Sequence, residues 1–224
     1  MLRKIQRISI SFYRNYRFRR DIDRTFCGAF EDQKAIFIHI PKAAGSSIAL
    51  SLFGHQVGHK SILEYYQRDF HKADTYFKFA FVRHPMDRLY SAFSFLRNGG
   101  MNTKDQAFAE KFLSNLSFGE FVKRLAEDPS MLEWYHFRQQ FTYLYDGFDP
   151  KNILVNYVGK YENLETDLKS ISNRLGTGQE IPHLNPTSRT VSVGEEGFSK
   201  ETIELVAQIY AEDFEVFGYS LPSL

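Results

Sequence analysis

Three short apolar runs, at residues 34–40, 76–82 and 153–158, divide the chain and predict the strands of a sheet. In the first two runs apolar side chains follow one another almost without interruption, which is typical of a strand buried on both faces in a parallel α/β sheet. Isoleucine and phenylalanine, which favour strands, dominate the first run. The pattern therefore predicts an α/β fold with a central parallel sheet flanked by helices.

Helices are predicted from their start and stop signals. Ser61 and Glu64 have the spacing of a capping box, and Pro85 stands where the first residue of a helix often does. Ser199 predicts the start of a last helix, which we expect to end before Gly218. Further helices are predicted in the aromatic-rich stretches 107–126 and 131–145.

Positive charge is concentrated at the N-terminus. The net charge is +1, but the first twenty residues carry seven basic residues and no acidic one. Their apolar residues fall on one helical face, which predicts contact with an anionic membrane surface or an acidic partner. A solvated extension, or an extra helix packed on the domain, is the alternative. We expect a basic extension over residues 1–30 and one domain over residues 31–224.

Composition narrows the classes of protein. Cys27 is the only cysteine, which excludes an internal disulfide and a cysteine-based metal site. No apolar run approaches the ~18–20 residues of a membrane span, and no secretory signal is present. We expect a cytoplasmic, membrane-peripheral protein that binds neither nucleic acid nor a metal ion.

The stretch from Lys34 to Ser47 contains a candidate anion site. After the predicted strand, Pro41 is followed by a turn of small residues and then a helix, so free N–H groups and the positive end of the helix dipole converge there. The turn consists of Lys42, Ala43, Ala44, Gly45, Ser46 and Ser47. Its lysine precedes the glycine, unlike the NTPase pattern GxxxxGK[ST], which argues against ATP or GTP. An ordinary strand–helix turn is the alternative.

A second candidate site follows the second predicted strand. Arg83 stands at the carboxyl end of that strand, where ligands bind in open α/β sheets. Together with the hydroxyl of Ser91 on the next helix, its guanidinium could hold another phosphate. His59, in a polar loop at a helix entrance, is the candidate general base, because a near-neutral pKa suits removal of a proton from a hydroxyl. His55 is the alternative base.

The segments IHIPKAAGSS and FVRHPMDRLYSAF together resemble the PAPS-dependent sulfotransferases of the carbohydrate type, which include heparan sulfate 2-O- and chondroitin sulfotransferases. The resemblance implies a three-layer, P-loop-like fold and transfer of a sulfuryl group from PAPS to a hydroxyl of a saccharide or glycolipid, with PAP as product. It places the 5′-phosphosulfate on Lys42 and the turn to Ser47, and the 3′-phosphate on Arg83 and Ser91. It also implies that Lys42 and His59 are catalytic.

Weaker similarity extends over about residues 34–219. Gln140 in HFRQQF matches a motif of bacterial members, and GKYENL at 159–164 resembles the family segment R/K-x-E-N-L. HLNPTSR at 183–189 resembles the loop over the 3′ end of the nucleotide, which implies contacts from Thr187 and Ser188. Without the membrane anchor and cysteines of eukaryotic members, the chain looks bacterial, or trimmed of its anchor. The alternatives are a P-loop-like nucleotide or sugar kinase and a non-catalytic PAP- or glycan-binding module.

Overall fold

The computed structural model describes Phe26 and residues 28–177 and 198–221. The strands in this part of the chain are β1 (Ala35–Ile38), β2 (Phe77–Val82) and β3 (Tyr157–Lys160). The α-helices are α2 (Gly28–Gln33), α3 (Gly45–Phe53), α4 (Ile62–Arg68), α5 (Phe70–Thr75), α6 (Pro85–Arg97), α7 (Thr103–Phe112), α8 (Phe118–Glu127), α9 (Leu164–Leu175), α10 (Lys200–Ile209) and α11 (Ala211–Phe217). The 3-10 helices are η1 (Pro129–Glu133), η2 (Phe141–Tyr143) and η3 (Tyr161–Asn163).

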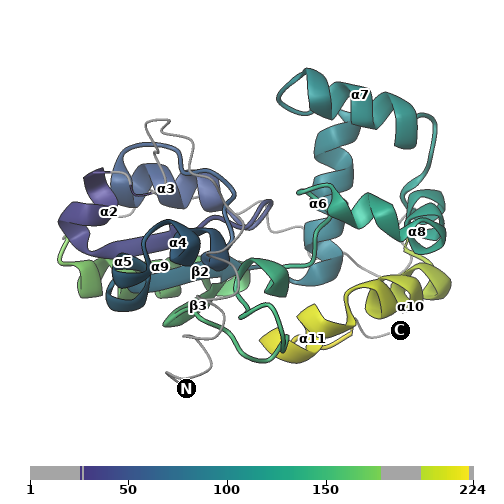
Figure 1. Cartoon of the computed structure of the whole chain (residues 1–224). Coiled ribbons are helices and arrows are strands. Elements are labelled where there is room, and N and C mark those ends of the chain that lie inside the picture. Colours follow the sequence, from purple (N-terminus) through teal and green to yellow (C-terminus); the bar gives the residue numbers. More distant parts are fainter. Residues whose placement is uncertain (1–25, 27, 178–197, 222–224) are drawn as a thin grey trace.

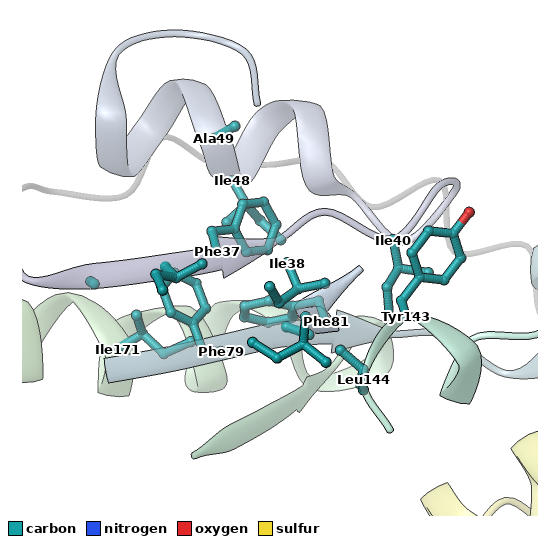
Figure 2. Close-up of a cluster of buried hydrophobic side chains, with 14 of the residues drawn as sticks. Phe37, Ile38, Ile40, Ile48, Ala49, Phe79, Phe81, Tyr143, Leu144 and Ile171 are labelled. Carbon is teal, nitrogen blue, oxygen red and sulfur yellow. The ribbon is translucent and has the colours of Figure 1, made fainter. Parts of the chain in front are cut away.

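The described strands form one small parallel sheet in the order β1-β2-β3. Ile38 lies opposite Ala80, so β1 and β2 end at the same edge of the sheet. Helices flank this sheet, and Figure 2 shows Ile48 of α3 and Ile171 of α9 within the cluster of buried side chains around β1 and β2. The prediction of an α/β fold with a parallel sheet flanked by helices is therefore confirmed.

The third strand lies later in the chain than predicted, at residues 157–160 instead of 153–158. Ile153 forms an isolated antiparallel bridge with Tyr145. Asn156 then bonds to Lys78 through both its backbone N–H and its side-chain oxygen. The parallel ladder with β2 begins only at the next residue, so the apolar pattern located the strand but not its register.

A second hydrophobic cluster is built mainly from helices and contains no strand residue, and we call this part the helical half, in contrast to the sheet half around β1–β3. It lies on the right of Figure 1, where α6, α7, α8, α10 and α11 gather beside the sheet. Phe121 of α8 packs against Phe93 and Phe137, with ring centroids 5.2 and 4.9 Å away. Helix α6 begins directly after β2 and so connects the two halves.

The stretch 107–126 is two helices, α7 and α8, and not one as predicted. Asn115 between them has a left-handed backbone with φ 63°, a conformation that ends a right-handed helix. Ser117 and Glu120 then form a capping box that starts α8. This capping pattern was present in the sequence and marks the missed boundary.

The prediction of a helix over 131–145 is wrong, because only the short 3-10 helices η1 and η2 form there. Tertiary partners take the backbone groups that a helix would use. The guanidinium of Arg88 donates to the carbonyls of His136 and Arg138 at 3.2 and 2.7 Å. The carboxylate of Asp213 accepts from the N–H groups of Gln140 and Phe141, both at 2.9 Å.

Most predicted helix ends are confirmed. The capping box at Ser61 starts α4, Pro85 is the first residue of α6, and Ser199 caps α10 by accepting from the Thr202 N–H at 3.2 Å. The last helix ends at Gly218 as expected, but it is broken into α10 and α11 at Tyr210. In the described part of the chain, no helix combines the length and apolar character needed to cross a membrane.

Candidate active site

The turn between β1 and α3 has an unusual backbone. Lys42 and Ala44 are both left-handed, with φ of 67° and 62°. Such a conformation costs a non-glycine residue ~1–3 kcal/mol and is concentrated at functional sites. Ala44 is the N-cap of α3 and supplies no side-chain hydrogen bond, so no N-cap side chain covers the N–H groups at the start of this helix. The turn therefore has the geometry expected of an anion site.

Gly45 is required by a neighbouring histidine. A Cβ atom at this position would lie 1.8 Å from Cδ2 of His39, so no other residue fits without displacing that ring. His39 is buried, and its Nδ1 lies 2.8 Å from the carbonyl oxygen of Val57. Because a carbonyl only accepts, the imidazole donates this bond. The turn is thus shaped from inside the protein by His39, whose role the sequence analysis missed.

His59 contacts this turn from the loop that precedes α4. Its Nδ1 donates to the carbonyl of His39 at 2.9 Å, and the two rings lie 4.1 Å apart. The neutral ring therefore carries its proton on Nδ1, which leaves Nε2 unprotonated. Desolvation lowers the pKa of His59, the hydrogen bond to His39 opposes this, and the charge of Lys42 lowers it further. These features suit a general base. Among the described residues, in contrast, the hydrogen bond of His55 goes to the adjacent Gln56 carbonyl.

Lys42 is a half-buried cation at the centre of the candidate site. Its Nζ lies 3.9 Å from the centroid of the Phe95 ring on α6, which favours a positive charge. Burial and, to a smaller extent, the charge of Arg83 lower the pKa of Lys42 to about 8, although the charge of Asp105 opposes them. Lys42 is therefore mostly protonated at pH 7. The effect of Arg83 also means that the two predicted phosphate-binding cations act on one another.

Arg83 is held rigidly at the end of β2. Its N–H donates to Oε1 of Gln140 and its carbonyl accepts from Nε2 of Gln140, both at 2.9 Å. Its guanidinium lies over the Tyr161 ring, 4.2 Å from the centroid. The buried Nε of Arg83 has no hydrogen-bond partner among the described residues. A phosphate oxygen would satisfy this donor, so the residues present fit a nucleotide phosphate.

The motifs singled out by resemblance form the scaffold of Arg83. Asp213 orders Gln140 through its backbone N–H, and Gln140 in turn holds Arg83. Glu162, in the GKYENL segment, accepts from the N–H of His84 at 2.7 Å and from the hydroxyl of Tyr219 at 2.9 Å. Resemblance located Gln140 and Glu162, and the structure shows what they contact.

The structure says less about the other residues that were predicted to contact the nucleotide. Ser91 is half-buried in the second turn of α6 and makes no contact with Arg83 among the described interactions, so its role stays a prediction. In the turn, Ala43 is buried, Ser47 is half-buried and Ser46 is exposed. Thr187 and Ser188, and residues 1–25 and 27 of the predicted extension, lie outside the described residues, and their expected roles stay predictions. Of the described residues in that extension, Phe30 is buried in the core of the sheet half.

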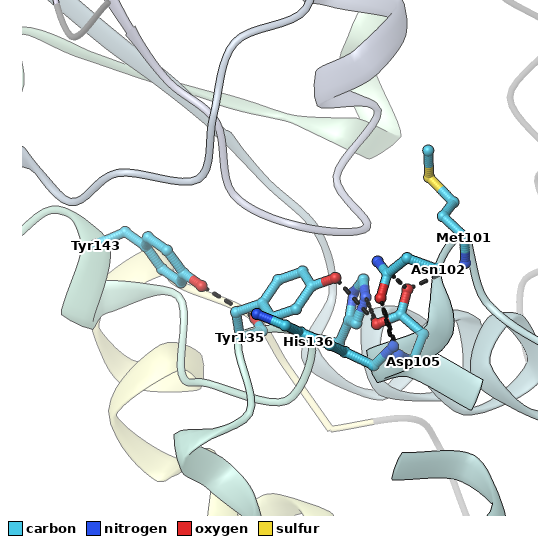
Figure 3. A network of polar contacts seen from close by, with 7 residues as sticks. Met101, Asn102, Asp105, Tyr135, His136 and Tyr143 are labelled. Carbon is cyan, nitrogen blue, oxygen red and sulfur yellow. Dashed lines mark hydrogen bonds and ion pairs between the residues drawn. The ribbon is translucent and has the colours of Figure 1, made fainter. Parts of the chain in front are cut away.

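Three residues of the helical half reach this site without having been predicted. Asp105 of α7 is fully buried and accepts a hydrogen bond from the hydroxyl of Tyr135 at 3.1 Å (Figure 3). Nε2 of His136 lies 3.5 Å from the same carboxylate. Tyr135 also stacks on His59, with ring centroids 5.4 Å apart. Within the described residues, no group of three or more histidine, cysteine or acidic side chains could hold a metal ion.

The described residues thus combine an α/β fold with a lysine-bearing turn after one strand and an arginine held by Gln140 after the next. Comparison with known proteins identifies the family. The family described as Sulfotransferase family matches residues 29–220, so the chain belongs to the sulfotransferase family.

Carbohydrate sulfotransferases are among the relatives. Carbohydrate sulfotransferase 14 of Danio rerio is 30% identical over 68% of this chain and 46% of its own length. Carbohydrate sulfotransferase 11 of the same species is 28% identical over 68% of this chain and 49% of its own length. This chain thus spans about half the length of these relatives. An uncharacterized protein of Archaeoglobus fulgidus is 28% identical over 48% of the chain. No solved structure matches the chain.

Proposed function

We propose that this protein transfers the sulfuryl group of PAPS to a hydroxyl of a saccharide. The observation that carries the proposal is the pairing of Lys42 and Arg83 after adjacent parallel strands, each fixed by its own scaffold. A nucleotide with phosphates at its 5′ and 3′ ends supplies negative charge for both cations. Family membership and the carbohydrate sulfotransferase relatives support the same assignment. A P-loop-like, three-layer arrangement is part of this proposal.

The residues present suggest how the transfer proceeds. Nε2 of His59 accepts the proton of the acceptor hydroxyl, and the acceptor oxygen bonds to sulfur. The bond between sulfur and the bridging oxygen of PAP breaks, so the products are a sulfate ester, PAP and a protonated His59. Lys42 and the N–H groups of the turn neutralise the charge that develops on the departing oxygen. Arg83 and the turn hold the two ends of the nucleotide and so keep donor and acceptor in line.

Replacement of the two cations tests this proposal. Lys42→Ala and Arg83→Ala should each reduce transfer of labelled sulfate from PAPS by about 10²–10³-fold, because loss of one preorganised charged contact costs roughly 2–4 kcal/mol in the transition state. Lys169→Ala, at an exposed position on α9, is the matched control and should retain full activity. Circular dichroism checks the fold of each variant. Full activity of both Lys42→Ala and Arg83→Ala would refute the proposal.

The acceptor can be identified by a screen with the same assay. Chondroitin, dermatan and heparan chains, lipid-linked oligosaccharides and simple alcohols can be offered with labelled PAPS. We expect a saccharide to be preferred over a simple alcohol. A heparan sulfate 2-O- or chondroitin-type specificity belongs to this proposal and is decided by the position of the sulfate in the product.

A further inference from the structure

Asp105 is a buried carboxylate beside the cations of the candidate site. It accepts hydrogen bonds from the Met101 N–H at 3.0 Å, from Nδ2 of Asn102 at 3.1 Å and from the Tyr135 hydroxyl at 3.1 Å (Figure 3). No part of its side chain reaches solvent. Neither PAPS nor an acceptor can touch it, so any effect on the reaction must act through its neighbours.

Two contacts connect this carboxylate to the predicted base. The hydroxyl of Tyr135 is fixed by Asp105, and the ring of Tyr135 stacks on His59. The other end of the tyrosine is also held, because its carbonyl accepts from the Tyr143 hydroxyl at 3.0 Å. The His59 ring therefore has its Nδ1 bonded on one side and an anchored aromatic ring on the other. The direction in which Nε2 of His59 points therefore depends on both contacts.

A second connection is electrostatic and leads to Lys42. His136 is 5% exposed, lies 3.5 Å from Asp105 and packs on the Phe95 ring at 5.1 Å between centroids. Nζ of Lys42 lies 3.9 Å from the centroid of the same Phe95 ring. The charges of Arg83 and Asp105 act on the pKa of Lys42, and those of Asp105, Lys42 and His59 act on the pKa of His136. Asp105 is thus a negative charge beside a group of cations and titratable rings.

We propose that Asp105 and Tyr135 form a positioning pair for sulfuryl transfer, in which Asp105 anchors the ring that orients His59 and supplies a buried negative charge to the group formed by His136, Phe95 and Lys42. This inference rests on the proposed function for its catalytic consequence. Neither residue is catalytic, because Asp105 is enclosed and the hydroxyl of Tyr135 is engaged in its hydrogen bond to Asp105. Both come from the helical half, outside the two phosphate motifs.

The electrostatic part is tested directly on Lys42. Asp105 raises the pKa of Lys42, whereas burial and Arg83 lower it to about 8. Asp105→Asn keeps the shape but removes the charge, so Lys42 should lose its proton at a lower pH than in the wild type. NMR titration of [ε-13C]lysine-labelled protein measures this, with the Lys42 signal assigned by its loss in Lys42→Arg. The decrease of kcat/KM at alkaline pH, its alkaline limb, should move to lower pH together with the titration of Lys42.

The positioning part is tested with Tyr135→Phe, which removes the hydroxyl but keeps the ring and the charge of Asp105. We expect kcat to fall by about tenfold or more, since small misplacements of a reacting group cost up to ~10²-fold. The affinity for PAP and the alkaline limb should not change. Tyr157 and Asp167 offer matched controls, because the Tyr157 hydroxyl donates to Asp167 at 3.0 Å in the sheet half. Tyr157→Phe should keep kcat, and Asp167→Asn should keep the Lys42 titration.

The outcomes separate the inference from the proposed function. An unchanged Lys42 titration in folded Asp105→Asn, or an unchanged kcat in Tyr135→Phe, overturns the inference. A loss of equal size in the Tyr157→Phe control overturns it as well. If Asp105→Asn does not fold, Tyr135→Phe still decides. Absence of sulfate transfer by the wild type would instead refute the proposed function, while the Lys42 titration would still test the electrostatic part.

Discussion

The two histidines beside β1 are kept neutral by their surroundings. His39 is buried and donates to a backbone carbonyl, and burial together with the charge of His59 lowers its pKa to about 4. His59 donates in the same manner and keeps Nε2 for a proton. The ring of His39 occupies the space that a Cβ atom at position 45 would need, so it packs tightly against Gly45.

The lowered pKa of His39 predicts that the folded protein loses stability in mild acid. In the unfolded chain His39 takes up a proton near the ordinary histidine pKa of 6.5, but in the folded protein its pKa is lowered to about 4. Between these values the unfolded state binds more protons, so the free energy of unfolding decreases as the pH falls. The contribution of His39 between pH 7 and pH 5 is about 2 kcal/mol.

Urea unfolding at several pH values measures this effect. The variant His39→Gln keeps a donor for the Val57 carbonyl but does not titrate, so its stability should depend less on pH than that of the wild type. His71→Gln, at an exposed position on α5, is the control and should leave the pH dependence unchanged. Identical pH dependence in His39→Gln and the wild type would contradict the account.

At the scale of secondary structure, local sequence signals correctly predicted the elements that are fixed by local interactions. Ser61, Pro85 and Ser199 start helices through their own side chains or ring, and the buried runs before Lys42 and Arg83 are strands. The stretch 131–145 could not be predicted in this way. Its helical pattern is overridden by partners that lie 48 to 73 residues away in the sequence.

The irregular segment is what positions Arg83, through Gln140. The variant Gln140→Leu removes both hydrogen bonds to the Arg83 backbone and should weaken PAP binding as well as stability, the latter by ~1–3 kcal/mol for unpaired buried groups. Gln139→Leu is a matched control, because Nε2 of Gln139 bonds to the carbonyl of Ile209 and not to Arg83. Calorimetry with PAP and thermal unfolding separate the two effects. Equal PAP affinity in the two variants would contradict the role of Gln140.

At the scale of the whole molecule, the candidate site lies where the two halves meet. The sheet half supplies Lys42 and Arg83, whose strand-end positions made them predictable from the sequence. The helical half supplies Asp105 and Tyr135, which no motif marked, because only the tertiary structure brings Tyr135 against both Asp105 and His59. Gln140 is an intermediate case, because family resemblance located it but only the structure showed that it holds Arg83.

The central claim is that one nucleotide is held at both ends, by Lys42 at the 5′ end and by Arg83 at the 3′ end. Calorimetric titration with PAP and with adenosine 5′-phosphate, which lacks the 3′-phosphate, tests it most directly. Arg83→Ala should weaken binding of PAP by about 10–100-fold, the value of a charged hydrogen bond, and leave adenosine 5′-phosphate unaffected. Lys42→Ala should weaken both ligands. Equal weakening of both ligands by Arg83→Ala would contradict the account.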